Sequence, residues 1–181
     1  VIKQGQPGCF DEHGTMPSCI FEKNNGEKLL YYSGWSRRTS VPYSNLAGVC
    51  FSQDGYKFHR RFDGPVLSTN PMEPFSATSP FVYYSDGTYF CYYCSGTYWH
   101  KINKKFEHTY DIKLATSKDG INWYQSNRSA VPSSNPFEAI TRPSIIKLNG
   151  SHHMWFCYRG SKNFRNGKES YRIGYAVSED L

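Results

Sequence analysis

The chain has 181 residues, of which 38% are hydrophobic and 20% are charged, which predicts one folded domain with a packed core and excludes a disordered chain. Its formal net charge of +6 is spread along the sequence, so we do not expect a nucleic acid as a partner, because that needs basic residues clustered on one face. No apolar stretch approaches the ~18 residues of a membrane-spanning helix, so no membrane partner is expected either.

The N-terminal part of the chain, as far as Leu67, contains a run of predicted strands separated by turns. The sequence Ser52-Gln-Asp-Gly55 is typical of a tight turn, and aromatic runs such as Leu29-Leu-Tyr-Tyr-Ser-Gly34 favour strands. The pattern therefore predicts short antiparallel strands joined by hairpins. The expected strands lie over 18–21, 29–34, 46–51 and 56–62.

The next segment repeats this order of features. An apolar strand follows Pro80, an aromatic run ends at Gly96, and the Asp-Gly turn recurs as Ser117-Lys-Asp-Gly120. The expected strands lie over 81–84, 89–96, 112–116 and 121–125.

The last segment repeats it once more and stops early. It begins with Arg142-Pro-Ser-Ile-Ile146, and its aromatic run is Met154-Trp-Phe-Cys-Tyr-Arg-Gly160. The chain ends just after the turn at Ser178-Glu-Asp180, so no outer strand is expected here. The expected strands lie over 144–148, 154–160 and 172–177.

The three segments are copies of one unit. Their prolines stand at positions 17, 80 and 143, so the position number rises by 63 at each step. Four antiparallel strands repeated at this length are typical of a β-propeller blade, whose first strand lies at the axis. A β-sandwich is the alternative, but it does not require the same order of features at equal spacing. We therefore expect an all-β propeller in a single domain over 1–181, with blades over 15–67, 78–131 and 141–181.

Three blades are fewer than the ~4–8 of closed propellers. We therefore expect an incomplete ring, or one in which a second copy of the chain covers the open blade edges. Helices should be scarce, because no segment shows a sustained apolar period of 3.6 residues.

The six cysteines predict reduced thiols and no metal site. Cys91 and Cys94 resemble half of a zinc site, but residues i and i+3 of a strand point to opposite faces, and no second pair completes the motif. Buried thiols fit a cytoplasmic protein, and the start of the sequence lacks the pattern of a signal peptide. No motif for a cofactor occurs, so none is expected.

Candidate catalytic residues come directly before the inner strands. An aromatic residue followed by a polar one occurs as Phe10-Asp11, Phe75-Ser76 and Phe137-Glu138. If equivalent positions converge on the axis, Asp11 and Glu138 face each other there. Glycoside hydrolysis needs such a pair, ~6.5–9.5 Å apart for inversion and ~5–5.5 Å for retention. The alternative is structural: Asp11 caps a turn and Glu138 pairs with Arg142.

Aromatic and cationic residues near the same end of the units are candidates for binding sugar. Flat aromatic faces stack on sugar rings, and Arg and His donors hold hydroxyl groups. Arg142 is the strongest candidate because it directly precedes an inner-strand proline, while His108 is expected in a loop before the third strand of its unit. The candidate substrate-binding residues are Arg142, Trp35, Trp99, Arg37, His108 and Arg159.

Several motifs resemble the glycoside-hydrolase-like five-bladed β-propeller superfamily, which includes arabinanases, xylosidases, levansucrases and invertases. The resemblance covers nearly the whole chain and is greatest to an uncharacterised bacterial branch. It implies that the chain forms the middle three of five blades. The motifs are Phe10-Asp-Glu-His-Gly-Thr-Met-Pro-Ser18, Tyr31-Tyr-Ser-Gly-Trp35, Arg142-Pro-Ser144, Met154-Trp-Phe-Cys-Tyr-Arg-Gly160 and Tyr171-Arg-Ile-Gly-Tyr-Ala176.

The resemblance also implies roles for two carboxylates. Glu138 resembles the catalytic acid of that superfamily, and Asp11 matches a carboxylate position of its second blade. The base of the first blade would lie before Val1, and Ser76 replaces a possible tuning carboxylate. Glycan hydrolysis or binding through an acidic and aromatic axial cleft is therefore the leading hypothesis. A non-catalytic carbohydrate-binding propeller and a protein-interaction propeller are the alternatives.

Overall fold

The computed structural model describes residues 2–160, 162–165 and 167–180. Within these ranges the chain forms eleven strands and no helix, which confirms the prediction of an all-β fold. It follows that no helix in the described part of the chain could cross a membrane.

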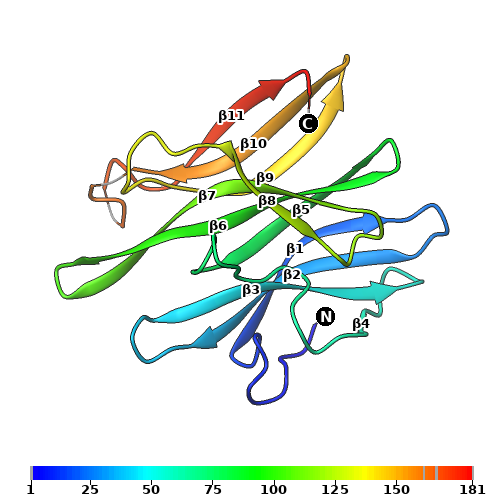
Figure 1. Ribbon diagram of the computed structural model, residues 1–181, viewed down its shortest axis with the longest axis horizontal. Helices are drawn as coiled ribbons and strands as arrows, with labels where there is room; N and C mark the ends of the chain where they lie inside the picture. The colour runs from blue at the N-terminus through cyan, green and yellow to red at the C-terminus, as the bar shows by residue number, and fades with distance from the viewer. Residues whose placement is uncertain (1, 161, 166, 181) are drawn as a thin grey trace.

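The first unit is a four-stranded antiparallel sheet with its strands in chain order (Figure 1). Its turns follow the predicted chemistry: the Asp54 carboxylate accepts hydrogen bonds from the N–H groups of Tyr56 and Lys57, both at 2.8 Å. These bonds lower the pKa of Asp54 to about 2. The strands are β1 (Gly14–Glu22), β2 (Lys28–Arg37), β3 (Tyr43–Ser52) and β4 (His59–Arg60).

The second and third units share one larger sheet. They were expected to be separate, but the middle of β7 meets the start of β9 in a parallel bridge between Tyr110 and Ala139. Each unit begins one or two residues before its predicted boundary. The strands of the second unit are β5 (Ala77–Ser85), β6 (Thr88–Ile102), β7 (Lys105–Ser117) and β8 (Tyr124–Val131), and those of the third are β9 (Ala139–Leu148), β10 (Ser151–Arg159) and β11 (Arg172–Ser178).

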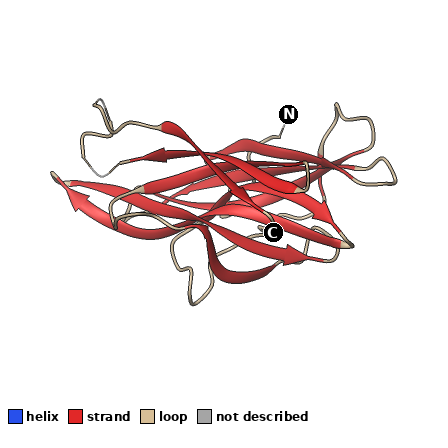
Figure 2. Cartoon of the chain, turned by 90° about the horizontal axis from the view of Figure 1, so that it is seen from above, coloured by secondary structure: helices blue, strands red, loops and turns tan. Residues whose placement is uncertain are grey.

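The core consists of the layers between neighbouring units. Figure 2 shows the molecule from above as strands joined by loops, without a helix. Successive residues of a strand point to opposite faces, so Tyr93 packs with Tyr31 of the first unit, whereas Tyr92 packs with Ile145 of the third. The middle unit is therefore buried on both sides. The six cysteines are free, and Cys91 and Cys94 are among the buried ones, as expected.

The outer face of the third unit is apolar and uncovered. Trp155 of β10 lies opposite Tyr175 of β11, and 40% and 53% of these residues are exposed. Ile173, which is 77% exposed, and Val177 extend the same face of β11. We call Trp155, Ile173, Tyr175 and Val177 the open face.

The first strands of the three units, β1, β5 and β9, lie side by side (Figure 1). In each of these strands the pairing register shifts near the proline. The shift lies between Pro17 and Cys19 in β1 and between Thr78 and Phe81 in β5. In β9 it lies opposite residues Trp155 and Cys157 of the neighbouring strand β10. Such bulges change the direction in which the side chains next to the proline point. They place the residue before each proline at the cavity described next.

Candidate functional site

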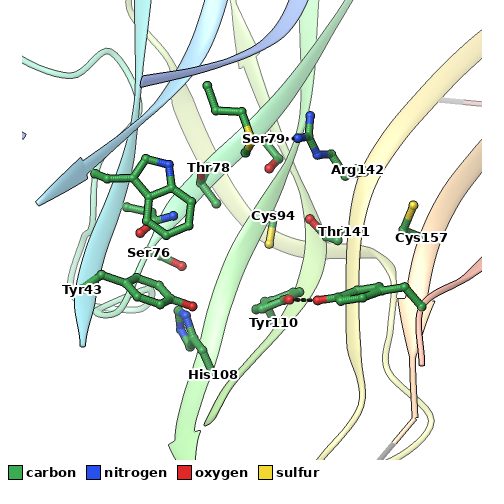
Figure 3. A pocket seen from close by; sticks show the side chains of 14 residues that line it. Tyr43, Ser76, Thr78, Ser79, Cys94, His108, Tyr110, Thr141, Arg142 and Cys157 are labelled. Atoms are coloured by element: carbon green, nitrogen blue, oxygen red, sulfur yellow. Dashed lines mark hydrogen bonds between the residues drawn. The ribbon is translucent and has the colours of Figure 1, made fainter. Parts of the chain in front are cut away.

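A cavity of about 290 Å³ lies where the inner strands converge (Figure 3). All three units contribute to its wall, as do strands β2, β3, β6, β7 and β10. The lining residues are Met16, Trp35, Tyr43, Asn45, Ser76, Thr78, Ser79, Cys94, His108, Tyr110, Thr141, Arg142, Cys157 and Tyr171.

The repeat is visible in this wall. Met16, Ser79 and Arg142 each precede an inner-strand proline and so hold equivalent positions in the three units, and all three line the cavity. Thr78 and Thr141, which stand one repeat period apart, line it as well. Equivalent positions of the three units therefore converge on one cavity, although of the predicted set Asp11, Ser76 and Glu138 only Ser76 lines it.

Two of these positions carry an unusual backbone. Ser79 has φ = 49° and Arg142 has φ = 57°, in the left-handed region that residues other than glycine seldom adopt. Each also precedes a proline, which restricts the backbone further. Such conformations cost roughly 1–3 kcal/mol and cluster at functional sites, where the surrounding structure holds them.

His108 lies on a strand of the cavity wall, and the expectation of a loop here was wrong. A tight turn at Asn103 and Lys104, both with positive φ, lets β6 and β7 continue as a long hairpin in which His108 lies opposite Trp99. The two rings stack with centroids 4.1 Å apart and planes at 8°. Burial, with a smaller effect from the charge of Arg159, lowers the pKa of His108 to about 4. The imidazole is therefore neutral at pH 7.

Four polar atoms in the cavity wall have no partner in the described protein. They are Asn45 Oδ1, Ser76 Oγ, Thr78 Oγ1 and His108 Nε2, and each residue is at most 9% exposed. Buried polar atoms are nearly always hydrogen-bonded. A group of them around one cavity is what a polyhydroxylated ligand would satisfy.

Gly96 leaves room beside two of these atoms. A Cβ at this position would lie 2.3 Å from His108 Nε2 and 2.6 Å from Ser76 Oγ. The two atoms therefore face the same point, which only a glycine keeps open.

The six predicted substrate-binding residues lie in three different places. Trp35, His108 and Arg142 line the cavity. Trp99 stacks behind His108, and Arg159 is buried there, donating a hydrogen bond of 2.7 Å from Nη2 to the carbonyl oxygen of His108. These two residues are outside the wall and contact the histidine from behind.

Arg37 lies away from the cavity, at the exposed end of β2. Its backbone N–H donates to His13 Nδ1 at 3.4 Å, and its side chain is not part of the wall. The aromatic residue beside Trp35 is instead Tyr43, whose ring lies 5.0 Å from that of Trp35 and 4.9 Å from that of Trp99.

Asp11 is fully buried inside the first unit and does not line the cavity. Its Oδ2 lies 2.5 Å from Nη1 of Arg60 and accepts a hydrogen bond of 2.9 Å from the Tyr32 hydroxyl. A Cβ at Gly34 would lie 2.5 Å from the Asp11 Cβ, so the surrounding chain encloses this side chain closely. The expected pairing of Asp11 with Glu138 across a cleft is therefore not what the structure shows.

Glu138 lies just before β9, outside the cavity wall. Its Oε2 accepts hydrogen bonds from the backbone N–H of Ser134 at 2.6 Å and from its hydroxyl at 2.9 Å. Glu12 accepts from the N–H of Gly8 at 2.8 Å, also four residues earlier. Glu12, two repeat periods before Glu138, is thus its counterpart, and the alignment of Glu138 with Asp11 was wrong by one residue.

Most of the polar residues that line the cavity were not predicted from the sequence. Thr78 and Thr141 could have been found from the repeat, since Thr15, Thr78 and Thr141 hold the same position in successive units. Asn45 and Tyr43 had no such signal, because they precede the predicted third strand of the first unit. In the described residues, no three His, Cys, Asp or Glu side chains gather so that they could hold a metal.

No family model matches the chain. It is 34% identical over 181 residues to two uncharacterized proteins of Mycobacterium tuberculosis, from strain CDC 1551 / Oshkosh and strain ATCC 25618 / H37Rv. The alignments cover 99% of this chain but 57% of each relative. The chain therefore spans a little over half the length of these relatives.

The fold is similar to that of solved glycoside hydrolases. One structure, described simply as a glycoside hydrolase, superimposes with a TM-score of 0.70 at 16% identity, over 95% of this chain and 48% of the other. The GH32 beta-fructofuranosidase BmSUC1 of Bombyx mori gives 0.68 at 21% identity, over 94% and 34%.

A family 117 glycoside hydrolase of Zobellia galactanivorans gives a TM-score of 0.66 at 17% identity, over 98% of this chain and 56% of that enzyme. At these identities the similarity establishes the fold, which is that of propeller-type glycoside hydrolases. The number of blades and the closure of the ring stay predictions.

Proposed function

We propose that this chain forms the glycan-binding part of a carbohydrate-active propeller, and that the sugar occupies the axial cavity. The observation that carries the proposal is the set of four buried polar atoms without protein partners around one cavity. The aromatic residues Trp35, Tyr43 and Tyr110 in the same wall offer flat faces for a sugar ring. The fold shared with glycoside hydrolases supports the same ligand class.

The test is sugar binding measured by ligand-observed NMR or calorimetry with a panel of mono- and oligosaccharides. The variant Ser76→Ala removes one of the four polar atoms with little change in shape, and it should weaken binding several-fold. Ser85→Ala, at the far end of β5, is the matched control and should bind like the parent. Binding that is equal in all three proteins would contradict the proposed site.

Hydrolysis is a second candidate function, favoured by the similarity to glycoside hydrolases. Glu138 would donate the proton to the leaving oxygen, because it is a partly exposed carboxylate three residues before Thr141 of the wall. No carboxylate lines the described cavity. A second carboxylate would therefore have to come from outside the described cavity, since Asp11 is enclosed.

In the 181-residue chain, we propose that a second copy covers the open face. The corresponding faces of the first and second units are covered by their neighbours, and exposed apolar areas of this kind mark interaction sites. Tyr175→Lys should reduce self-association in sedimentation experiments. Tyr56→Lys, at a tyrosine that is 85% exposed in a loop, should not.

A further inference from the structure

Resting on the proposed function, we infer that the cavity selects a sugar unit that carries a negatively charged group, and that Arg142 binds this group. The shared chemistry is that of an oxyanion, as in a uronic acid carboxylate, a sugar phosphate or a sugar sulfate. The inference depends on the charge of the wall, on the contacts of Arg142 and on the layout of the polar atoms.

The charge on the cavity wall is of positive sign. Among the fourteen residues that line the cavity, Arg142 is a cation, and the wall includes no aspartate, glutamate or lysine. His108 is neutral at pH 7, because burial lowers its pKa to about 4. Burial also raises the pKa of Tyr43 and of Cys94 to about 12. The wall therefore presents an uncompensated positive charge to a ligand.

Arg142 has no anionic partner in the part of the chain that the structure describes. The hydrogen bond found for its side chain runs from Nη2 to the thioether sulfur of Met16 at 2.9 Å, and a thioether is a weak acceptor. No ion pair joins Arg142 to a described carboxylate. A guanidinium in this state can offer two parallel N–H groups to an oxyanion.

The backbone holds Arg142 at the cavity. Its left-handed conformation, before Pro143 and within the bulge of β9, points its side chain toward Met16 and Ser79 of the other two units (Figure 3). These equivalent positions in the other units are uncharged. Of the three equivalent positions, only the one in the third unit therefore carries a charge, so a charged ligand would bind the cavity in one orientation.

A second guanidinium reinforces the positive potential. Arg159 is 4% exposed, forms no ion pair with a described carboxylate, and lies 3.7 Å from the centre of the Phe164 ring. Its charge acts at short range on the cavity wall, since it contributes to the low pKa of His108. In a poorly solvated site such a charge favours an anionic ligand over a neutral one.

Two of the polar atoms without partners, Ser76 Oγ and His108 Nε2, belong to residues at the other end of the cavity. Figure 3 shows Ser76 and His108 away from Arg142, with Thr78 and Cys94 between them. A sugar with its oxyanion at Arg142 would therefore direct its hydroxyl groups toward Ser76, Thr78 and His108. This arrangement distinguishes an acidic sugar from a free inorganic anion, which would use only the Arg142 end.

The experiment compares matched ligands on the 181-residue chain by calorimetry. Glucuronate is paired with glucose, galacturonate with galactose, and glucose 6-phosphate and glucose 6-sulfate form separate arms; inorganic phosphate tests the anion alone. We expect at least one acidic sugar to bind about 10–100-fold more tightly than its neutral partner, as a charge-assisted hydrogen bond allows. The arms identify which oxyanion the site prefers.

Variants assign the effect to Arg142. Arg142→Gln should remove the preference and bring acidic and neutral sugars to the same affinity, whereas Arg142→Lys should retain part of it. Arg128→Gln, at an exposed arginine outside this cavity, is the control and should bind like the parent. Thermal melting curves of all variants show whether each one is folded.

The outcomes separate the inference from the proposed function. Equal affinity for acidic and neutral sugars in the parent chain would overturn the inference and leave sugar binding intact. Binding of inorganic phosphate as tightly as of every acidic sugar would also overturn it. If no sugar binds to the folded chain, both the inference and the proposed function are wrong.

Discussion

The indole ring of Trp99 stacks on the imidazole of His108, with the ring centres 4.1 Å apart and the planes at 8°. Trp99 itself does not line the cavity, while His108 does. The stack fixes the plane of the imidazole and therefore the direction in which Nε2 points. A residue outside the site thus controls a hydrogen-bonding atom inside it.

Replacing Trp99 should therefore weaken sugar binding without removing a contact to the sugar. We expect Trp99→Ala to lower the affinity several-fold and Trp99→Phe to restore most of it, because a phenyl ring can still stack. Titration of the two variants with the same sugar tests this. Equal loss in both would mean that the indole acts in some other way.

The free energy of unfolding should decrease as the pH falls, because His108 is buried in its neutral form. Its pKa falls from 6.5 in the unfolded chain to about 4 in the folded protein. Between these pH values the unfolded state therefore binds a proton at this histidine and the folded state does not. Its contribution is fully present above pH 6.5 and is lost as the pH falls toward 4, by on the order of 3 kcal/mol. Urea unfolding of the parent and of His108→Gln between pH 4 and 7 measures this. The variant should show a flatter dependence over that range.

Adding a methyl group at Gly96 should disturb two polar side chains of the cavity wall. A methyl group there meets His108 Nε2 and Ser76 Oγ at distances no real Cβ shows, so Gly96→Ala must displace both side chains, at a cost of about 1–3 kcal/mol. Sugar binding should be lost in a protein that still folds. Gly64→Ala is the control, since nothing lies within 4 Å of its Cβ. Unchanged binding in Gly96→Ala would contradict the assigned site.

Asp11 should matter for stability. Its removal leaves the guanidinium of Arg60, 19% exposed, without its partner, and breaking a buried pair costs about 3–5 kcal/mol. We expect Asp11→Ala to lower the free energy of unfolding by about that amount in denaturant titrations. The double variant Asp11→Ala with Arg60→Met should recover part of the loss, because no unpaired charge remains.

A catalytic role of Glu138 can be distinguished from its structural hydrogen bond by comparison with Glu12, the equivalent residue of the first unit. Glu138 and Glu12 each accept a hydrogen bond from the N–H group four residues earlier, so Glu12→Gln is a matched control for Glu138→Gln. If Glu138 is the acid, its variant abolishes glycoside hydrolysis by a protein that contains this chain, while the Glu12 variant retains it. Equal activities would reject the catalytic role.

The repeat made much of the fold predictable. The constant spacing of the three prolines identified the units and the convergence of their inner strands, because equivalent positions in stacked sheets must meet at one place. The predicted strands over 46–51 and 112–116 lie inside β3 and β7. The long β6–β7 hairpin was missed, since Asn103 and Lys104 form its turn without a glycine.

The candidate site was harder to predict for a physical reason. A carboxylate before an inner strand can point to the axis or into its own unit, and neighbours distant in sequence decide which. Arg60 and Tyr32 hold Asp11 inside the first unit, and the local sequence around Asp11 does not reveal them. Asn45 was missed because it is an ordinary polar residue in the sequence, and only the structure shows that its buried side-chain oxygen lacks a partner.

The cavity and the packing layers draw on different parts of each unit, which makes the site open to redesign. Met16, Ser79 and Arg142 line the cavity from the bulges, while mid-strand residues such as Tyr31 and Tyr92 join the units. A combinatorial library at positions 16, 79 and 142 would therefore vary ligand preference with little effect on how the units stack. Over evolution, the same separation would allow one scaffold to acquire new specificities by changing three residues.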